Sequence, residues 1–253
     1  MRATRIIPVL ALSAAMTWPL GQATAFDLTA LSDAERAAFG EEVRAYLLAN
    51  PQVLIEVSQA LESQQAAAQA EGDQSTIAAN AAEIFADKTS FVGGNPEGSL
   101  TVVEFIDYRC GYCRKAHGDV AELVKSDGDI RYVVKEFPIL GEESLLASQF
   151  AIAALQTAGP EAYEKINAGF YESFRGDVTL STLGAFAEDL GLDPAPILAA
   201  MDTPAVTSVI NDNHLLGQRL DISGTPTFII GGQMVRGYVP LRQMRAIVED
   251  ERS

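Results

Sequence analysis

Two cysteines stand three positions apart in the chain, and their spacing is the clearest sign of chemistry. Residues 110–113 read Cys-Gly-Tyr-Cys. The apolar, β-branched run at residues 100–106 predicts a buried strand before this motif, and the apolar residues after it recur at the spacing of a helix. At a helix start, unpaired backbone N–H groups and the positive end of the helix dipole favour a thiolate at Cys110. Cys113, one turn later, lies on the same face and within reach of a disulfide. The spacing therefore predicts a reversible dithiol–disulfide site.

Two other uses of a cysteine pair have less support. A structural disulfide that closes four residues contributes about 2 kcal/mol in the chain-entropy model, against about 4.7 kcal/mol for a hundred-residue loop. A zinc site normally has four ligands, and the chain adds only two histidines, His117 and His214. His117 is one turn beyond Cys113, which leaves open a site for Cu(I) or another soft metal. We expect redox chemistry without a metal or other cofactor.

The first 25 residues have the three parts of a secretory signal. Arg2 and Arg5 form a positive start, residues 6–20 are mostly apolar, and residues 23–25 read Ala-Thr-Ala, a small-residue cleavage site. The apolar run is short for a membrane span and contains two prolines, so we expect cleavage after Ala25 rather than anchoring. The mature protein is then expected in the periplasm, where disulfides form and persist.

Composition limits the partners of the chain. Its formal net charge is −16 and it has no basic tract, which argues against binding to nucleic acid. Hydrophobic residues make up 48% of the chain, the content of a globular protein.

Residues 26–89 predict helices that lack a core of their own. A capping box at Ser32 and Glu35 starts the first helix, which Asn50-Pro51 ends. A second helix leads into an Ala-, Gln- and Gly-rich stretch at 66–72 that joins it to the next domain, and a third helix is predicted at 80–88. These amphipathic helices must pack either on the main domain or on copies of themselves.

Residues 90–253 predict a domain of strands and helices in a defined order. A Gly-Gly-Asn-Pro boundary at 93–96 precedes the strand at 100–106, the helix with the cysteines and a second strand at 130–138. Helices are predicted at 144–157, 160–174, 180–190, 194–201 and 204–220, followed by a hairpin at 227–238 and a last helix at 241–250. This is the order of an α/β, thioredoxin-like fold with a helical domain inserted at about 141–222.

Two distant segments resemble the DsbA family of exported thiol–disulfide oxidoreductases. Residues 103–113, Val-Glu-Phe-Ile-Asp-Tyr-Arg-Cys-Gly-Tyr-Cys, are similar to its strand and active site. Residues 224–228, Gly-Thr-Pro-Thr-Phe, are similar to the loop that places a cis-proline against the cysteines. The resemblance covers residues 90–253 and implies a cis bond before Pro226. It also implies that the backbone of Thr225 pairs with an extended substrate strand.

Further roles follow from the chemistry and from this resemblance. Cys110 is expected to form the mixed disulfide with substrate, and Cys113 to resolve it. Glu104 occupies a strand position where the superfamily often has a buried acid, which would relay a proton to or from Cys113; a surface glutamate at the strand end is the alternative.

The residues between the cysteines resemble a different branch. Gly111 and Tyr112, together with Thr225 before the proline, resemble the DsbC-type isomerases more than DsbA, which more often carries Pro-His and Val at these positions. The site is therefore expected to favour isomerase or reductase activity over strong oxidation.

The N-terminal segment, residues 31–62, resembles that of ScsC-type proteins, DsbA relatives associated with copper tolerance, some of which oligomerise through it. We therefore expect an exported, homo-oligomeric thiol–disulfide oxidoreductase that acts on cysteine-containing exported proteins. A membrane redox partner would reset the cysteine pair. A DsbA-type disulfide oxidase and a copper-binding periplasmic chaperone are the alternatives.

Overall fold

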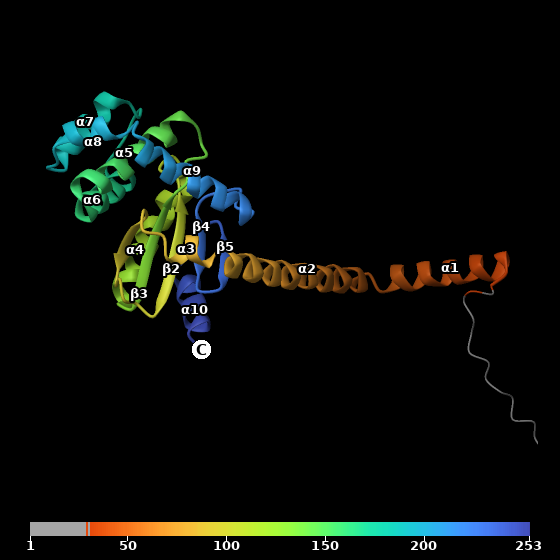
Figure 1. Cartoon of the computed structure of the whole chain (residues 1–253). Coiled ribbons are helices and arrows are strands. Elements are labelled where there is room, and N and C mark those ends of the chain that lie inside the picture. The colour runs from red at the N-terminus through yellow and green to blue at the C-terminus, as the bar shows by residue number, and fades with distance from the viewer. Residues whose placement is uncertain (1–28, 30) are drawn as a thin grey trace, which may run out of the picture. The chain divides into compact units, whose positions relative to one another are not determined.

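The computed structural model describes residue 29 and residues 31–253 (Figure 1). The expected signal peptide, residues 1–25, lies outside them. The described residues divide into two compact units, and the division falls between Ala60 and Leu61. Within these residues, we find no helix long and apolar enough to cross a membrane.

The first unit contains α1 (Asp33–Ala49) and the beginning of α2 (Gln52–Ala79). α1 starts at the expected capping box, in which the Ser32 backbone N–H donates to the Glu35 carboxylate at 2.9 Å. No residue of α1 is buried. Large apolar side chains stay exposed along this unit: Phe39, Val43, Tyr46, Leu48, Leu54, Ile55 and Val57.

α2 continues without interruption through residues 66–72, where the sequence predicted a connecting stretch. Alanine and glutamine are strong helix formers, and together they outweigh the cost of about 1 kcal/mol for the single glycine. The end of α2 belongs to the second unit: Ile77 is buried in its core, and Asp73 accepts two hydrogen bonds from Arg236 at 2.7 and 2.9 Å.

The second unit is built on one mixed sheet in the order β1-β3-β2-β4-β5. Its strands are β1 (Phe91–Gly94), β2 (Leu100–Ile106), β3 (Ile130–Glu136), β4 (Thr227–Ile230) and β5 (Gln233–Arg236). β2 pairs with β3 in parallel and with β4 antiparallel, and β4 and β5 form the expected hairpin. β2 is therefore the central strand, and the cysteine motif follows directly from it.

The segment between the N-terminal helices and β2 differs from the prediction. The third helix is short, α3 (Ala81–Phe85), and the expected boundary at 93–96 overlaps the edge strand β1, which pairs antiparallel with β3. Two glycines give β1 little intrinsic strand preference, so pairing with β3 decides its conformation. Gly94 has a φ of +65°, and a Cβ there would stand 2.5 Å from the Ile130 carbonyl oxygen, which explains the glycine.

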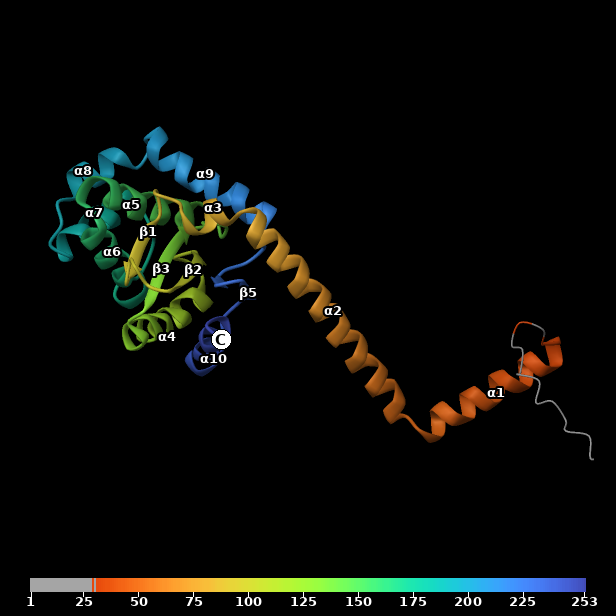
Figure 2. The same cartoon turned by 60° about the horizontal axis from the view of Figure 1, so that its bottom comes forward.

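Helices cover both faces of the sheet. On one face lie α4 (Gly111–Asp127) and α10 (Leu241–Glu251), and on the other α3 and α9 (Pro204–Arg219), as Figure 2 shows. Side chains of β2 alternate accordingly: Leu100 and Val102 pack in the α4 cluster, and Val103 and Phe105 in the α9 cluster. Five helices follow β3 and precede β4 in the chain: α5 (Glu142–Ala158), α6 (Pro160–Glu172), α7 (Leu180–Asp189), α8 (Pro194–Ala200) and α9. The thioredoxin-like fold with inserted helices is confirmed.

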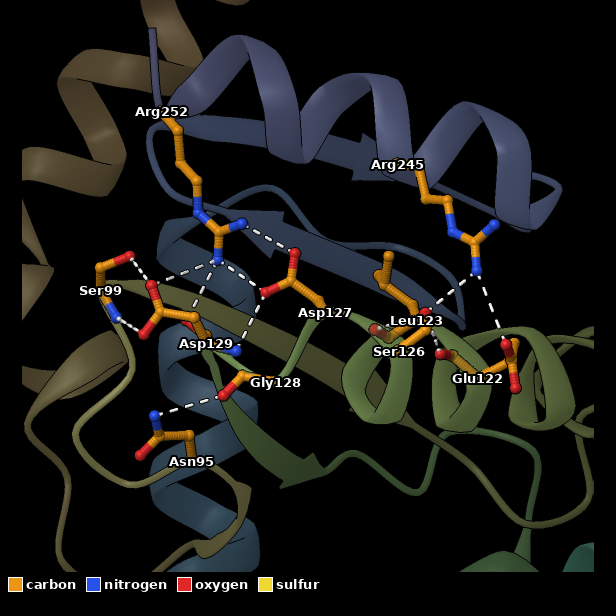
Figure 3. A network of polar contacts seen from close by, with 10 residues as sticks. All are labelled: Asn95, Ser99, Glu122, Leu123, Ser126, Asp127, Gly128, Asp129, Arg245 and Arg252. Atoms are coloured by element: carbon orange, nitrogen blue, oxygen red, sulfur yellow. Dashed lines mark hydrogen bonds and ion pairs between the residues drawn. The ribbon is translucent and has the colours of Figure 1, made fainter.

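A polar network fixes the far end of α4 (Figure 3). Arg252, just after α10, donates to both oxygens of Asp127 at 2.7 and 2.8 Å and to the Asp129 carbonyl at 3.1 Å. Asp129 also accepts from the Ser99 hydroxyl at 2.5 Å. The turn from α4 into β3 is thus tied to α10 and to the start of β2, which holds the helix that carries the cysteines.

Candidate active site

Cys110 is the N-cap residue of α4, with extended backbone angles of −76° and 118°. Both cysteines are free thiols in this structure, and Cys110 is 9% exposed whereas Cys113 is 1% exposed. Tyr112 between them projects outward and is largely exposed. Both cysteines are therefore largely buried, and Cys110 lies closer to solvent than Cys113.

The loop before β4 closes over Cys110. The Thr225–Pro226 peptide bond is cis, and the Cys110 sulfur lies 3.1 Å from the Thr225 carbonyl oxygen, to which it donates a hydrogen bond when it is protonated. Cys110 and Thr225 are 115 positions apart in the sequence, yet they are in direct contact in the fold. The cis-proline loop and the start of α4 therefore lie next to one another.

The two thiols have opposite acidities. A hydrogen bond from the Cys113 thiol and, to a lesser extent, hydrogen bonds from the backbone N–H groups at the start of α4 lower the pKa of Cys110 to about 5, against opposing burial. The same contact with Cys110, burial and the charge of Glu104 raise the pKa of Cys113 well above its ordinary value. At neutral pH the site holds a Cys110 thiolate and a protonated Cys113.

Glu104 lies on β2 and is buried, so it is not a surface residue at the strand end. Its carboxylate accepts a hydrogen bond from the Tyr132 hydroxyl on β3. Burial raises the pKa of Glu104 to about 7, although the hydrogen bond from Tyr132 acts in the opposite direction and lowers it. A carboxyl group with this pKa exchanges protons at physiological pH, which suits a general acid or base.

A second buried carboxylate was not predicted from the sequence. Glu136, at the end of β3, accepts hydrogen bonds from the hydroxyls of Tyr108 at 2.7 Å, Ser148 at 2.7 Å and Tyr163 at 2.5 Å. These donors come from the loop before Cys110, from α5 and from α6. Burial raises the pKa of Glu136 to about 7. Glu136 thus ties the inserted helices to the loop before Cys110. The sequence signal that could have pointed to it is a charged residue at the end of an apolar strand.

The two histidines lie apart. The His117 Nε2 atom stands 3.6 Å from the Glu172 carboxylate and its ring packs on Tyr171, whereas the His214 Nε2 atom lies 3.1 Å from the Pro138 carbonyl oxygen. Burial lowers the pKa of His117. Across residue 29 and residues 31–253, no group of three or more His, Cys, Asp or Glu side chains has the arrangement of a metal site.

Residues 86–250 match the family model described as thioredoxin, and residues 35–68 match the model of the copper resistance protein ScsC N-terminal domain. The first match spans more than half of the chain, so the chain belongs to the thioredoxin family.

Three solved structures support this placement. A thioredoxin-like oxidoreductase from Silicibacter pomeroyi DSS-3 is 37% identical, with a TM-score of 0.63 and coverage of 68% of this chain and 96% of that one. The thiol-disulfide exchange protein alpha-DsbA2 from Wolbachia pipientis is 29% identical, with a TM-score of 0.67 and coverage of 72% and 97%. Salmonella enterica Typhimurium BcfH is 26% identical, with a TM-score of 0.71 and coverage of 87% and 97%.

Curated relatives include longer proteins. A Na(+)/H(+) antiporter NhaA from Herminiimonas arsenicoxydans is 28% identical over 64% of this chain, and the chain spans 25% of its length. The thiol:disulfide interchange protein DsbA of Bordetella pertussis is 25% identical over 56% of this chain and 68% of its own length. The expected likeness to DsbA and ScsC proteins is confirmed.

Proposed function

We propose that the chain is an exported thiol–disulfide oxidoreductase that acts on the cysteines of other exported proteins. The observation that carries this proposal is the pairing of a low-pKa Cys110, at the start of α4 and beside the Thr225–Pro226 loop, with a more deeply buried, protonated Cys113. Likeness to a thiol-disulfide exchange protein supports it. The site needs no cofactor, because the two sulfurs themselves carry the electrons.

The reaction follows thiol–disulfide exchange. The Cys110 thiolate attacks one sulfur of a substrate disulfide, a mixed disulfide forms, and the other substrate sulfur leaves as a thiolate. Cys113 then passes its proton to the Glu104 carboxylate and attacks the Cys110 sulfur. The Cys110–Cys113 disulfide forms, the second substrate thiolate leaves, and the substrate has gained two electrons. The reverse sequence oxidises a substrate dithiol.

We infer that isomerisation or reduction is the physiological direction. Gly111 and Tyr112 between the cysteines and Thr225 before the cis-proline support it, through their resemblance to DsbC-type isomerases. A membrane redox partner in the periplasm would then keep Cys110 and Cys113 reduced.

The N-terminal helices are proposed to join copies of the chain. The first unit exposes seven large apolar residues and buries none in α1, and such a stripe is stable in water only when it is covered. The match of residues 35–68 to the ScsC N-terminal domain supports self-association here. Several sites in one assembly would hold a misfolded substrate at high effective concentration, which is what isomerisation needs.

The reduction potential of the Cys110–Cys113 pair tests the direction. A value of about −200 to −230 mV, with activity on scrambled ribonuclease, is the expected result. A reduction potential of about −120 mV, the value typical of a strong disulfide oxidant, would instead establish the DsbA-type alternative. Cu(I) titration of the wild type and of Cys110→Ser tests the copper chaperone: tight binding that depends on Cys110, without exchange activity, would replace the oxidoreductase proposal.

A further inference from the structure

Two buried side-chain oxygens in the described part of the chain have no hydrogen-bond partner, and both border the cysteines. They are the hydroxyls of Thr225 and of Tyr171. A buried hydroxyl without a partner is destabilising, and such groups are rare enough that each requires an explanation. Thr225 adjoins Cys110, as described above. Tyr171, on the inserted helix α6, has no role in the mechanism so far.

Tyr171 lies against the segment of α4 that contains Cys113. Its ring centroid is 5.0 Å from that of His117, one turn after Cys113, and the Arg114 guanidinium stands 6.0 Å from the same ring. Arg114, the residue after Cys113, also donates to the Tyr171 carbonyl oxygen. On its other side the ring is 5.3 Å from that of Tyr108. Tyr171 and Cys113 are buried in the same core cluster.

The surroundings keep the Tyr171 hydroxyl protonated. Burial raises the pKa of Tyr171 well above the ordinary value, and negative charge on Cys113, Tyr108, Glu104 and Glu136 raises it further. The cations beside it are Arg114 and, when protonated, His117. The hydroxyl is therefore available only as a neutral donor.

We propose that the Tyr171 hydroxyl donates a hydrogen bond to the Cys113 thiolate that forms while the mixed disulfide is resolved. This role rests on the proposed disulfide exchange. The proton of Cys113 goes to Glu104, the Cys113 sulfur bonds to the Cys110 sulfur, and the substrate thiolate leaves. Tyr171 keeps its own proton throughout. A donor without a partner in the resting state that gains one when charge develops stabilises that charge selectively, which lowers the barrier.

Tyr171→Phe tests the role because it removes only the unpaired oxygen. Reduced protein is mixed with dithionitrobenzoate: Cys110 releases a first thionitrobenzoate, and attack by Cys113 on the mixed disulfide releases a second. We expect the second release to be about tenfold slower at neutral pH, the loss expected for one hydrogen bond to a charged group. The defect should persist at mildly basic pH, because the raised pKa of Cys113 keeps this thiol protonated there. Tm should be equal to or above that of the wild type, since no satisfied contact is lost.

Tyr163→Phe is the matched control, on the same helix but with a hydroxyl that is bonded to Glu136. It should lower Tm and slow the second release less than twofold. An unchanged second release in Tyr171→Phe would overturn the proposal, and so would a slower release accompanied by a fall in Tm as large as that of Tyr163→Phe. A wild type that gives no second release would overturn the proposed disulfide exchange as well.

Discussion

At the scale of single residues, the positions of the two cysteines in the fold give two chemically identical thiols different pKa values. Cys110 caps a helix and receives hydrogen bonds, whereas Cys113 is buried behind it and faces Glu104. The motif and its helix position were enough to predict the low pKa of Cys110. The partners of Glu104 and Glu136 were not predictable, because Tyr132 and Tyr163 reach them through tertiary packing that no local pattern encodes.

Glu104→Gln should slow the resolving step at least about tenfold near neutral pH, because it removes the proton acceptor of Cys113. The pKa of Glu104 is about 7, so the wild-type rate should fall as pH drops below that value and the carboxylate is protonated. The variant should lose this pH dependence. Stopped-flow measurement of the second thionitrobenzoate release between mildly acidic and mildly basic pH makes the comparison.

Tyr132→Phe is the companion variant, because it keeps the Glu104 carboxyl group and removes its hydrogen-bond donor. Loss of a donor to the carboxylate raises its pKa, so the pH profile should move to higher pH without flattening. A profile in Glu104→Gln that is identical to the wild type would remove Glu104 from the mechanism.

The stability of the reduced protein should depend on pH through Cys110. Its pKa falls from 9.0 to about 5 on folding, so its contribution to stability is fully present above pH 9 and is lost as pH falls through about 5. The reduced protein should therefore gain stability relative to the oxidised one between these limits. Urea unfolding of both forms across this range measures the difference, and a constant difference would contradict the lowered pKa.

At the scale of secondary-structure elements, the order of strands and helices after residue 100 agrees with the prediction, because long apolar periodicities specify these elements. β1 and the length of α2 were not predicted correctly: β1 depends on pairing with β3, and α2 on the helix preference of a stretch read as a connection. The apolar periodicity of the sequence was thus sufficient to place the cysteine motif between β2 and α4. The edge strand β1, in contrast, depends on a tertiary contact with β3.

Arg252→Ala should lower the free energy of unfolding by about 1 kcal/mol, because it removes a two-pronged contact with Asp127 from the end of α4. Arg245→Ala is the matched control: that arginine reaches Glu122 at 3.6 Å and should contribute less. The pKa of Cys110 should not change in either variant, since the network is at the opposite end of the helix. Equal losses of stability in both variants would show that the two-pronged contact of Arg252 with Asp127 contributes no more than the contacts of Arg245.

At the scale of the whole molecule, the N-terminal helices are expected to determine assembly. The second unit begins at Leu61, and Asp73 and Ile77 on α2 are packed into it. A truncated chain should therefore start at Leu61. A start near Asn80 would remove a buried isoleucine and the partner of Arg236.

The full-length mature chain should be a homo-oligomer, and the chain from Leu61 should be a monomer. The truncated chain should still reduce insulin, because the cysteines and the Pro226 loop are intact, but it should lose most isomerase activity. Light scattering measures both masses. A monomeric full-length protein or an oligomeric truncated one would rule out assembly through α1 and α2, and would favour a DsbA-type oxidase.

The most direct test of the central claim is the alkylation of reduced protein as a function of pH, with the labelled cysteine identified by mass spectrometry. Cys110 should be the residue modified, with a reactivity midpoint at about pH 5, and Cys113 should stay unlabelled in the folded protein. Cys110→Ser, measured in parallel, should show almost no labelling. Preferential labelling of Cys113, or a Cys110 midpoint near the ordinary thiol value of 9.0, would contradict the account.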